Sequence, residues 1–331
     1  MKQINIQINP HLELMNSILL TSKYNEMTKA HIGYGLMTEE VNEYTMAIKN
    51  FFEKYSDHPI YQYIEEMIPN GFTFSRPVEV ALSLGNSKDF KRKYMPSEMC
   101  LKYCGGMDKV DDLLKQLKAF EKETGYFAFF EKQKCFYAPY LEKAINMIQK
   151  LTYISILEQE FGKEQGDYCY VISSLMKGNY GVSFKNQSFG KTDMYSVFST
   201  DGYSISEAIL FHEYSHPFIN PLTEKYSDLV NHYQDAYEYL KPYRKEGFIS
   251  GYGDFEECVN EHLVRAMVIQ LLKKNGLFEE AEQMMNYDME LGYRYLPMIL
   301  EQYENYDKHR DVYHDFEAFY PTLIQVFSQP V

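Results

Sequence analysis

The sequence has no apolar run long enough to cross a membrane and no recognisable export signal. No stretch approaches the roughly 20 apolar residues of a membrane-spanning helix. Residues Met1 to Asn5 lead into a polar alternation, without the apolar core of a signal peptide. We therefore expect a protein that works in the cytoplasm.

Cysteine is scarce, and basic residues are outnumbered. The five cysteines form an odd number without framework spacing, which favours a reducing compartment. Cys100 and Cys104 form a C-x3-C pair, but no second Cys or His pair accompanies it, which argues against a structural zinc site. The net charge is -14, from 33 Lys and Arg against 47 Asp and Glu. Nucleic acids and anionic membranes require basic surfaces, so neither is expected as a partner.

Helical periodicity dominates most of the chain. Between Tyr168 and Thr200, aromatic and β-branched residues punctuated by Gly, Asn and Asp predict three short strands. A charged, Gly-containing segment, Lys163 to Asp167, is the best candidate for a boundary. The sequence predicts an α+β, predominantly helical protein with a helical half, residues 1–165, and a sheet-plus-helix half, residues 166–331. Predicted helices include Glu13–Ser22, Ile60–Ile68, Met107–Glu123, Leu141–Phe161, Phe278–Leu291, Leu296–Tyr306 and Phe316–Phe327, and the strands are Tyr168–Ser174, Tyr180–Lys185 and Met194–Thr200.

The segment His212-Glu213-Tyr214-Ser215-His216 has the pattern H-E-x-x-H. Residues four apart on a helix share a face, with Cβ atoms ~5–6 Å apart, so both imidazoles can reach one zinc ion at ~2.0–2.1 Å. Glu213 then lies beside the metal, where a base for activating water is needed. The alternative is a helix with two unrelated histidines.

The boundaries of this helix follow from capping residues and proline. Ser204 and Glu207 form a capping-box pattern, which predicts a helix from Ile205 to His216 with Ser204 as N-cap. Pro217 disfavours helical geometry at the residue before it and removes an amide from the helix. The helix is therefore expected to kink or end at His216, which would change the direction of that imidazole relative to His212.

A second apolar helix carries a candidate third ligand. Asp254 marks its start and Gly276 its end. Glu261 lies among apolar residues of this helix, where a carboxylate is costly to bury unless it is paired or binds metal. A buried ion pair with Arg265 is the alternative. The two roles are compatible, because Arg265 could orient a ligating carboxylate.

Three other acidic or imidazole side chains compete for the same role. Glu257 lies one turn before Glu261, but it is expected to take part in the cap with Asp254. Asp228 and His232 lie on a predicted intervening helix, Thr223 to Leu240, and are expected on a solvated face.

The H-E-x-x-H motif, followed downstream by Asn260-Glu261, resembles the gluzincin group of zinc metallopeptidases. The resemblance implies a zincin-like core in which His212, His216 and Glu261 bind zinc and Glu213 is the general base. Two further segments are similar to a poorly characterised bacterial family known only as a domain of unknown function. They are Asn9-Pro10-His11-Leu12-Glu13-Leu14-Met15 and His216-Pro217-Phe218-Ile219-Asn220-Pro221.

The resemblance also implies a Tyr or His that stabilises an oxyanion. Tyr252, in a Gly-rich loop over residues 247–253, is the candidate. Its rivals are Tyr233, Tyr237, His232 and His262. Gluzincins often carry a further carboxylate after the ligating Glu, where this chain has Arg265. The outer ligand sphere must therefore differ, with Glu224, Asp228, Asp235 and Asp254 as candidates.

The sequence therefore predicts a cytoplasmic zinc metallopeptidase that acts on a peptide or protein substrate. Two alternatives stay open. One is a catalytically inactive helical binding or scaffold protein on a metallopeptidase-like fold. The other is a zinc hydrolase of non-peptide amides or esters. The sequence indicates neither the cleavage preference nor the oligomeric state.

Overall fold

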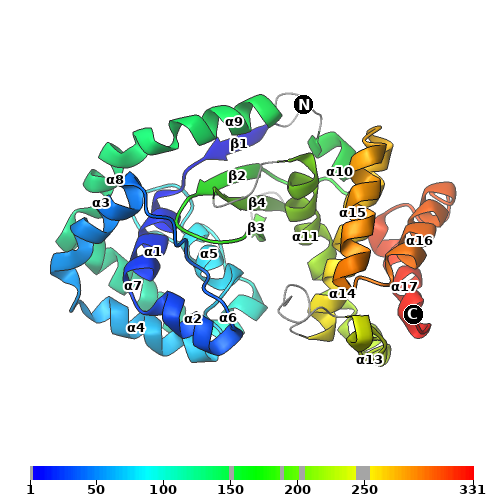
Figure 1. Cartoon of the computed structure of the whole chain (residues 1–331), viewed down its shortest axis with the longest axis horizontal. Helices are drawn as coiled ribbons and strands as arrows, with labels where there is room; N and C mark the ends of the chain where they lie inside the picture. Colours follow the sequence, from blue (N-terminus) through cyan, green and yellow to red (C-terminus); the bar gives the residue numbers. More distant parts are fainter. Residues whose placement is uncertain (1–2, 149–152, 187–189, 201–205, 244–253) are drawn as a thin grey trace. The chain divides into compact units, whose positions relative to one another are not determined.

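The computed structural model describes residues 3–148, 153–186, 190–200, 206–243 and 254–331. Over these residues the protein is predominantly helical and contains a small four-stranded mixed sheet (Figure 1). The predicted helical majority and small sheet are therefore confirmed. The chain forms two compact units. The N-terminal unit comprises Lys2–Lys150 and Gly166–Ser204, and the C-terminal unit comprises Leu151–Gln165 and Ile205–Val331.

The predicted division between residues 165 and 166 does not coincide with these units. Strand β1 (Ile4–Gln7) pairs in parallel with β2 (Tyr168–Ser173), so the strands after residue 166 join the N-terminal helices. Helix α10 (Tyr153–Phe161) packs against α11 (Glu207–Lys225) and α17 (Phe316–Leu323) and thus belongs to the C-terminal unit. The sequence predicted one helix over Leu141–Phe161, but α9 (Ala138–Ile148) and α10 belong to different units.

The sheet has the strand order β1-β2-β4-β3. Strand β4 (Lys191–Ser199) pairs in parallel with β2, and β3 (Tyr180–Asn186) pairs with β4 in antiparallel orientation. All three predicted strands are present, whereas β1 was not predicted. Every residue of β2 is buried, as expected for a parallel strand covered on both faces.

The Asn9-Pro10-His11 segment caps and begins helix α1 (Pro10–Thr21). The Asn9 side chain accepts hydrogen bonds from the amides of His11 and Leu12, and Pro10 occupies a first-turn position that needs no amide. The Asn9 amide group also donates to the carbonyl of Gly85 at 2.9 Å. The segment thus fixes the turn between β1 and α1. The other helices of this unit are α2 (Tyr24–Ile32), α3 (Glu43–Phe52), α4 (Pro59–Met67), α5 (Ser75–Leu82), α6 (Glu98–Cys104), α7 (Met107–Thr124), α8 (Tyr126–Gln133) and α9.

Helix α14 (Phe255–Lys274) is the central element of the C-terminal unit. It begins at Asp254, whose side chain accepts a hydrogen bond from the Glu257 amide at 2.8 Å, and it is followed by Gly276 in a left-handed conformation. Both predicted ends are confirmed. Apolar residues are buried on most sides of α14, which is typical of a helix surrounded by others. Its neighbours are α11, α12 (Ser227–His232), α15 (Phe278–Leu291) and α16 (Leu296–Lys308).

Helix α11 continues past the proline that was expected to end it. It runs to Lys225 and contains both Pro217 and Pro221. Beyond Pro217, Ile219 is fully buried, and the ring of Phe218 stacks on Phe161 of α10 with centroids 4.3 Å apart. The sequence predicted a kink or an end of the helix at His216. The helix does not end there, because burial of these side chains outweighs the amide lost at Pro217.

The start of α11 also differs from the prediction. Ser206 is the N-cap, and its side chain accepts a hydrogen bond from the Ile209 amide. Ser204 and Ile205 lie outside the described residues. The predicted intervening helix over Thr223–Leu240 is in fact the end of α11 followed by α12 and a short helix, α13 (Ala236–Leu240).

Among the described residues, no helix combines the length and the apolar character that crossing a membrane requires.

Candidate metal centre

Helices α11 and α14 pack side by side and bring the three predicted ligands together (Figure 1). His212 and His216 lie four residues apart on α11, and Glu261 lies on α14. The Nε2 atoms of the two imidazoles are 3.1 Å apart. Glu261 places Oε1 3.4 Å from His216 Nε2 and Oε2 3.9 Å from His212 Nε2.

These separations suit a single ion. In a tetrahedral zinc site with bonds of about 2.0–2.2 Å, neighbouring donor atoms lie about 3.3–3.6 Å apart. The donor atoms of His212, His216 and Glu261 all lie within 4.8 Å of one another. Among the described residues, no other group of three or more His, Cys, Asp or Glu side chains meets this condition. The donor set, two nitrogens and one oxygen, is one that zinc prefers.

The competing ligand candidates do not enter this group. His232 ends α12 and, like Asp228, is exposed. Asp254 caps α14 instead of contacting the three ligands. Cys100 and Cys104 are buried with their Sγ atoms 3.8 Å apart, but their pair has no third donor among the described residues.

Burial and charge set the ionisation of the two central groups. Burial lowers the pKa of His212 to about 3, against the opposing effect of the Glu261 carboxylate. Burial would raise the pKa of Glu261, but the neighbouring imidazoles and the Arg265 guanidinium outweigh it and lower this pKa to about 2. At neutral pH His212 is therefore neutral and Glu261 is charged, which are the forms that bind a metal.

Two of the three candidate ligands, His216 and Glu261, have a further polar neighbour. His216 Nδ1 lies 3.2 Å from Asn220 Oδ1, one turn further along α11. This contact favours the tautomer with the proton on Nδ1, which leaves the Nε2 lone pair for a metal. Arg265 donates from Nε to Glu261 Oε2 at 3.2 Å and from Nη1 to Asp288 Oδ1 at 2.6 Å. The predicted Glu261–Arg265 ion pair is therefore present beside the candidate ligand group.

Asp288 was not predicted. Of the carboxylates that were proposed for the outer sphere, Glu224, Asp228 and Asp235 are exposed. Asp288 lies on α15 and is fully buried. It shares a helix stripe with buried Ala281 and Leu291, so a carboxylate there needed a partner. That position on an apolar stripe was the signal in the sequence.

Glu213, the predicted base, is 6 % exposed on α11. A helix turns about 100° per residue, so this side chain leaves α11 between the directions of the two histidines and the core. Its neighbours on the helix, Tyr214 and Ser215, are buried. Glu213 thus directly follows His212 in the chain and precedes His216 by less than one helical turn.

The candidates for the oxyanion donor differ in burial, and one of them is not among the described residues. Tyr252 and the rest of its loop lie outside the described residues. His262 is fully buried in the core of the C-terminal unit, where its Nδ1 donates to the Cys258 carbonyl at 2.8 Å and its ring contacts Tyr293 and Phe327. His262 is therefore a core histidine. Tyr233 and Tyr237 follow α12 and are partly exposed.

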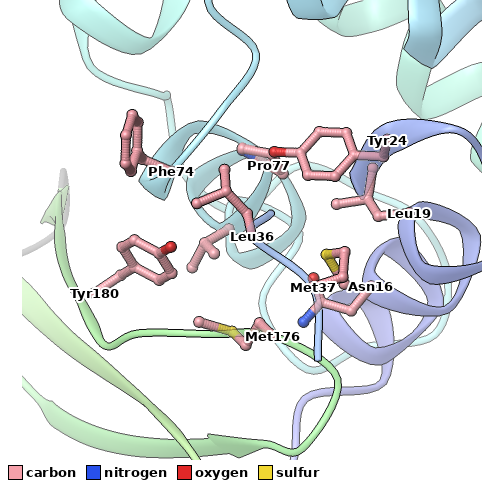
Figure 2. Close-up of a pocket in the computed structure, with 10 residues that line it drawn as sticks. Asn16, Leu19, Tyr24, Leu36, Met37, Phe74, Pro77, Met176 and Tyr180 are labelled. Carbon is pink, nitrogen blue, oxygen red and sulfur yellow. The ribbon is translucent and has the colours of Figure 1, made fainter. Parts of the chain in front are cut away.

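The N-terminal unit contains a small cavity of a different kind (Figure 2). Its walls include the apolar side chains of Leu19, Met37 and Met176, with Tyr180 on one side. Its volume of about 10 Å³ is only just enough for one water molecule. This cavity is too small to hold a substrate.

Comparison with known families places nearly the whole chain in one group. The family described as a domain of unknown function (DUF4932) matches residues 4–326. No curated protein and no solved structure matches the chain significantly.

Proposed function

The chain belongs to the DUF4932 family, and from its candidate metal centre we propose that it is a cytoplasmic zinc metallopeptidase with a zincin-like core. The observation that carries the proposal is the convergence of two Nε2 atoms and a carboxylate from α11 and α14. Two imidazole Nε2 atoms 3.1 Å apart beside a carboxylate form an arrangement that a divalent cation would stabilise.

The chain's own residues have distinct roles in this proposal. His212, His216 and Glu261 would hold the ion. Zinc bound there supplies a Lewis acid that polarises a carbonyl and lowers the pKa of water to about 7. Glu213 accepts a proton from the attacking water and delivers it to the leaving amine. Its burial keeps bulk water from competing for that proton.

The continuation of α11 supports the role of His216. A helix that ended at this residue would leave its imidazole free to turn away. Instead, buried residues on both sides of Pro217 fix the helix, and Asn220 contacts the imidazole from the next turn. The scaffold alternative would be favoured if Pro217 ended the helix at His216, and α11 instead continues to Lys225.

The test compares the wild-type protein with Glu213→Gln and His212→Ala. We expect the wild type to bind about one zinc ion per chain, because one group of three candidate ligands is present among the described residues. We also expect it to cleave members of a peptide library. Glu213→Gln should still bind zinc but lose about 10²- to 10⁴-fold in turnover, the typical contribution of a general base. His212→Ala should lose both.

Zinc content by mass spectrometry and cleavage products by chromatography are the measurements. Full turnover in Glu213→Gln, or a wild type that binds no zinc, would refute the proposal. A parallel panel of non-peptide amides and esters decides between the peptidase and the related hydrolase, because both would use the same residues.

A further inference from the structure

The Glu261 carboxylate has a charged partner in addition to the two histidines. Its Oε2 atom accepts a hydrogen bond from Arg265 Nε at 3.2 Å, while its two oxygens face His212 and His216. Arg265 lies four residues further along α14, so both side chains leave the same face of one helix. The guanidinium thus restricts the rotation that would turn this carboxylate away from the imidazoles.

Arg265 is itself held by groups outside α14. Its Nη1 donates to Asp288 Oδ1 at 2.6 Å, and its Cζ lies 4.2 Å from the centroid of the Tyr293 ring. Asp288 is fully buried on α15, and the Arg265 side chain is only 12 % exposed. A guanidinium that is paired on one edge and stacked on an aromatic face has few alternative conformations.

The charges of this group also fit a cation. Glu261 and Asp288 carry two negative charges and Arg265 one positive charge, so the cluster presents one net negative charge to the imidazoles. Asp288 touches none of the three candidate ligands directly in the contacts described, and it acts through Arg265. Removing Arg265 leaves Asp288 without its cationic partner, and removing Asp288 leaves Arg265 paired with Glu261 alone.

We propose that Arg265 and Asp288 are positioning residues that fix the Glu261 carboxylate for a divalent cation and thereby set the metal affinity of the centre. This inference rests on the proposed zinc centre. It assigns a function to a buried ion pair that would otherwise only stabilise the packing of α14 against α15.

The experiment measures the zinc dissociation constant of full-length Arg265→Met, Arg265→Lys and Asp288→Asn by competition with a chromophoric chelator. Outer-sphere partners of metal ligands typically contribute 10- to 100-fold in affinity, so about this loss is expected for Arg265→Met and Asp288→Asn. Arg265→Lys should also bind zinc at least about 10-fold more weakly, because lysine lacks the planar fork that contacts both carboxylates.

Lys274→Met provides a matched control on the same helix. Lys274 pairs with buried Glu160 and with Asp307, and it lies about 20 Å along the helix axis from Glu261. This variant should lose stability to urea but keep the wild-type zinc affinity. Circular dichroism selects the variants that retain the native fold, and Arg265→Lys, which keeps the buried cation, replaces Arg265→Met if the latter does not fold.

Unchanged zinc affinity in the folded variants would overturn the inference, as would an equal loss in Lys274→Met. A wild type that binds no zinc is a different result, because it removes the proposed metal centre itself.

Discussion

Glu261 and Glu13 have contrasting environments. Glu261 has a guanidinium and two imidazoles around it and stays ionised. Glu13, fully buried on α1, accepts hydrogen bonds from the hydroxyls of Tyr44 at 2.6 Å and Tyr137 at 2.7 Å. Burial raises the pKa of Glu13, and these neutral donors only partly oppose it. The Arg265 guanidinium and the two imidazoles thus distinguish the candidate ligand from a structural carboxyl group.

The pH dependence of stability should reveal the state of Glu13. Its folded-state pKa lies above the value of about 4.5 expected for the unfolded chain, so the folded state binds the proton more tightly. This contribution to stability is fully present below about pH 4.5 and is lost as the pH rises through the folded-state pKa. Each pKa unit by which the folded and unfolded states differ is equivalent to about 1.4 kcal/mol in the free energy of unfolding.

We therefore expect the free energy of unfolding of the wild type to fall, relative to that of Glu13→Gln, between pH 4.5 and pH 8. Urea unfolding of both proteins across this range is the measurement. Parallel curves for the two proteins would show that Glu13 has the same pKa in the folded and unfolded states.

Residue patterns predicted the ligands of the candidate centre but only part of its surroundings. The i, i+4 spacing of His212 and His216 is a local property of a helix, so the sequence contains it directly. Glu261 was recognisable as a carboxylate among apolar residues. The pairing of Arg265 with Asp288 joins two helices, and no local spacing encodes which buried carboxylate reaches the guanidinium.

At the scale of elements, the least accurate prediction concerned α11. A local rule places a helix end before Pro217, since proline in a helix interior costs about 3 kcal/mol. The structure continues the helix because Phe218, Ile219 and Leu222 are buried beyond it. Burying one such side chain contributes about 1.5–3 kcal/mol, so three of them outweigh the proline. Packing partners distant in sequence decide this, and the local pattern does not contain them.

Truncation of a side chain beyond Pro217 tests this explanation. Ile219→Ala should lower the free energy of unfolding by about 2–5 kcal/mol, because the fully buried side chain leaves a cavity. Glu224→Ala, at an exposed position of the same helix, should change it by no more than about 0.5 kcal/mol. Urea unfolding measures both. Similar small effects at the two positions would indicate that the helix does not continue into the core.

Strand β1 was not predicted, because its sequence alone carries too weak a strand signal. The strands β2, β3 and β4 were predicted because they are rich in aromatic and β-branched residues. The segment Ile4–Gln7 alternates apolar and amide side chains over only four residues. Its strand conformation depends on parallel pairing with β2, more than 160 residues away along the chain. That pairing also places the strands after residue 166 in the same compact unit as the N-terminal helices.

At the scale of the whole molecule, charge is distributed unevenly between the two units. The N-terminal unit contains 22 Lys and Arg against 22 Asp and Glu, whereas the C-terminal unit contains 11 against 25. The entire net charge of -14 therefore lies on the unit with the candidate metal centre. The resulting field favours cations over anions as ligands of this unit.

Anomalous X-ray scattering at the zinc edge tests most directly whether His212, His216 and Glu261 hold one zinc ion. Crystals equilibrated with zinc should show one strong peak about 2.0–2.2 Å from both Nε2 atoms and from the Glu261 carboxylate. Crystals that show no anomalous peak between these side chains, with the carboxylate bonded only to Arg265 and a protonated imidazole, would contradict the claim.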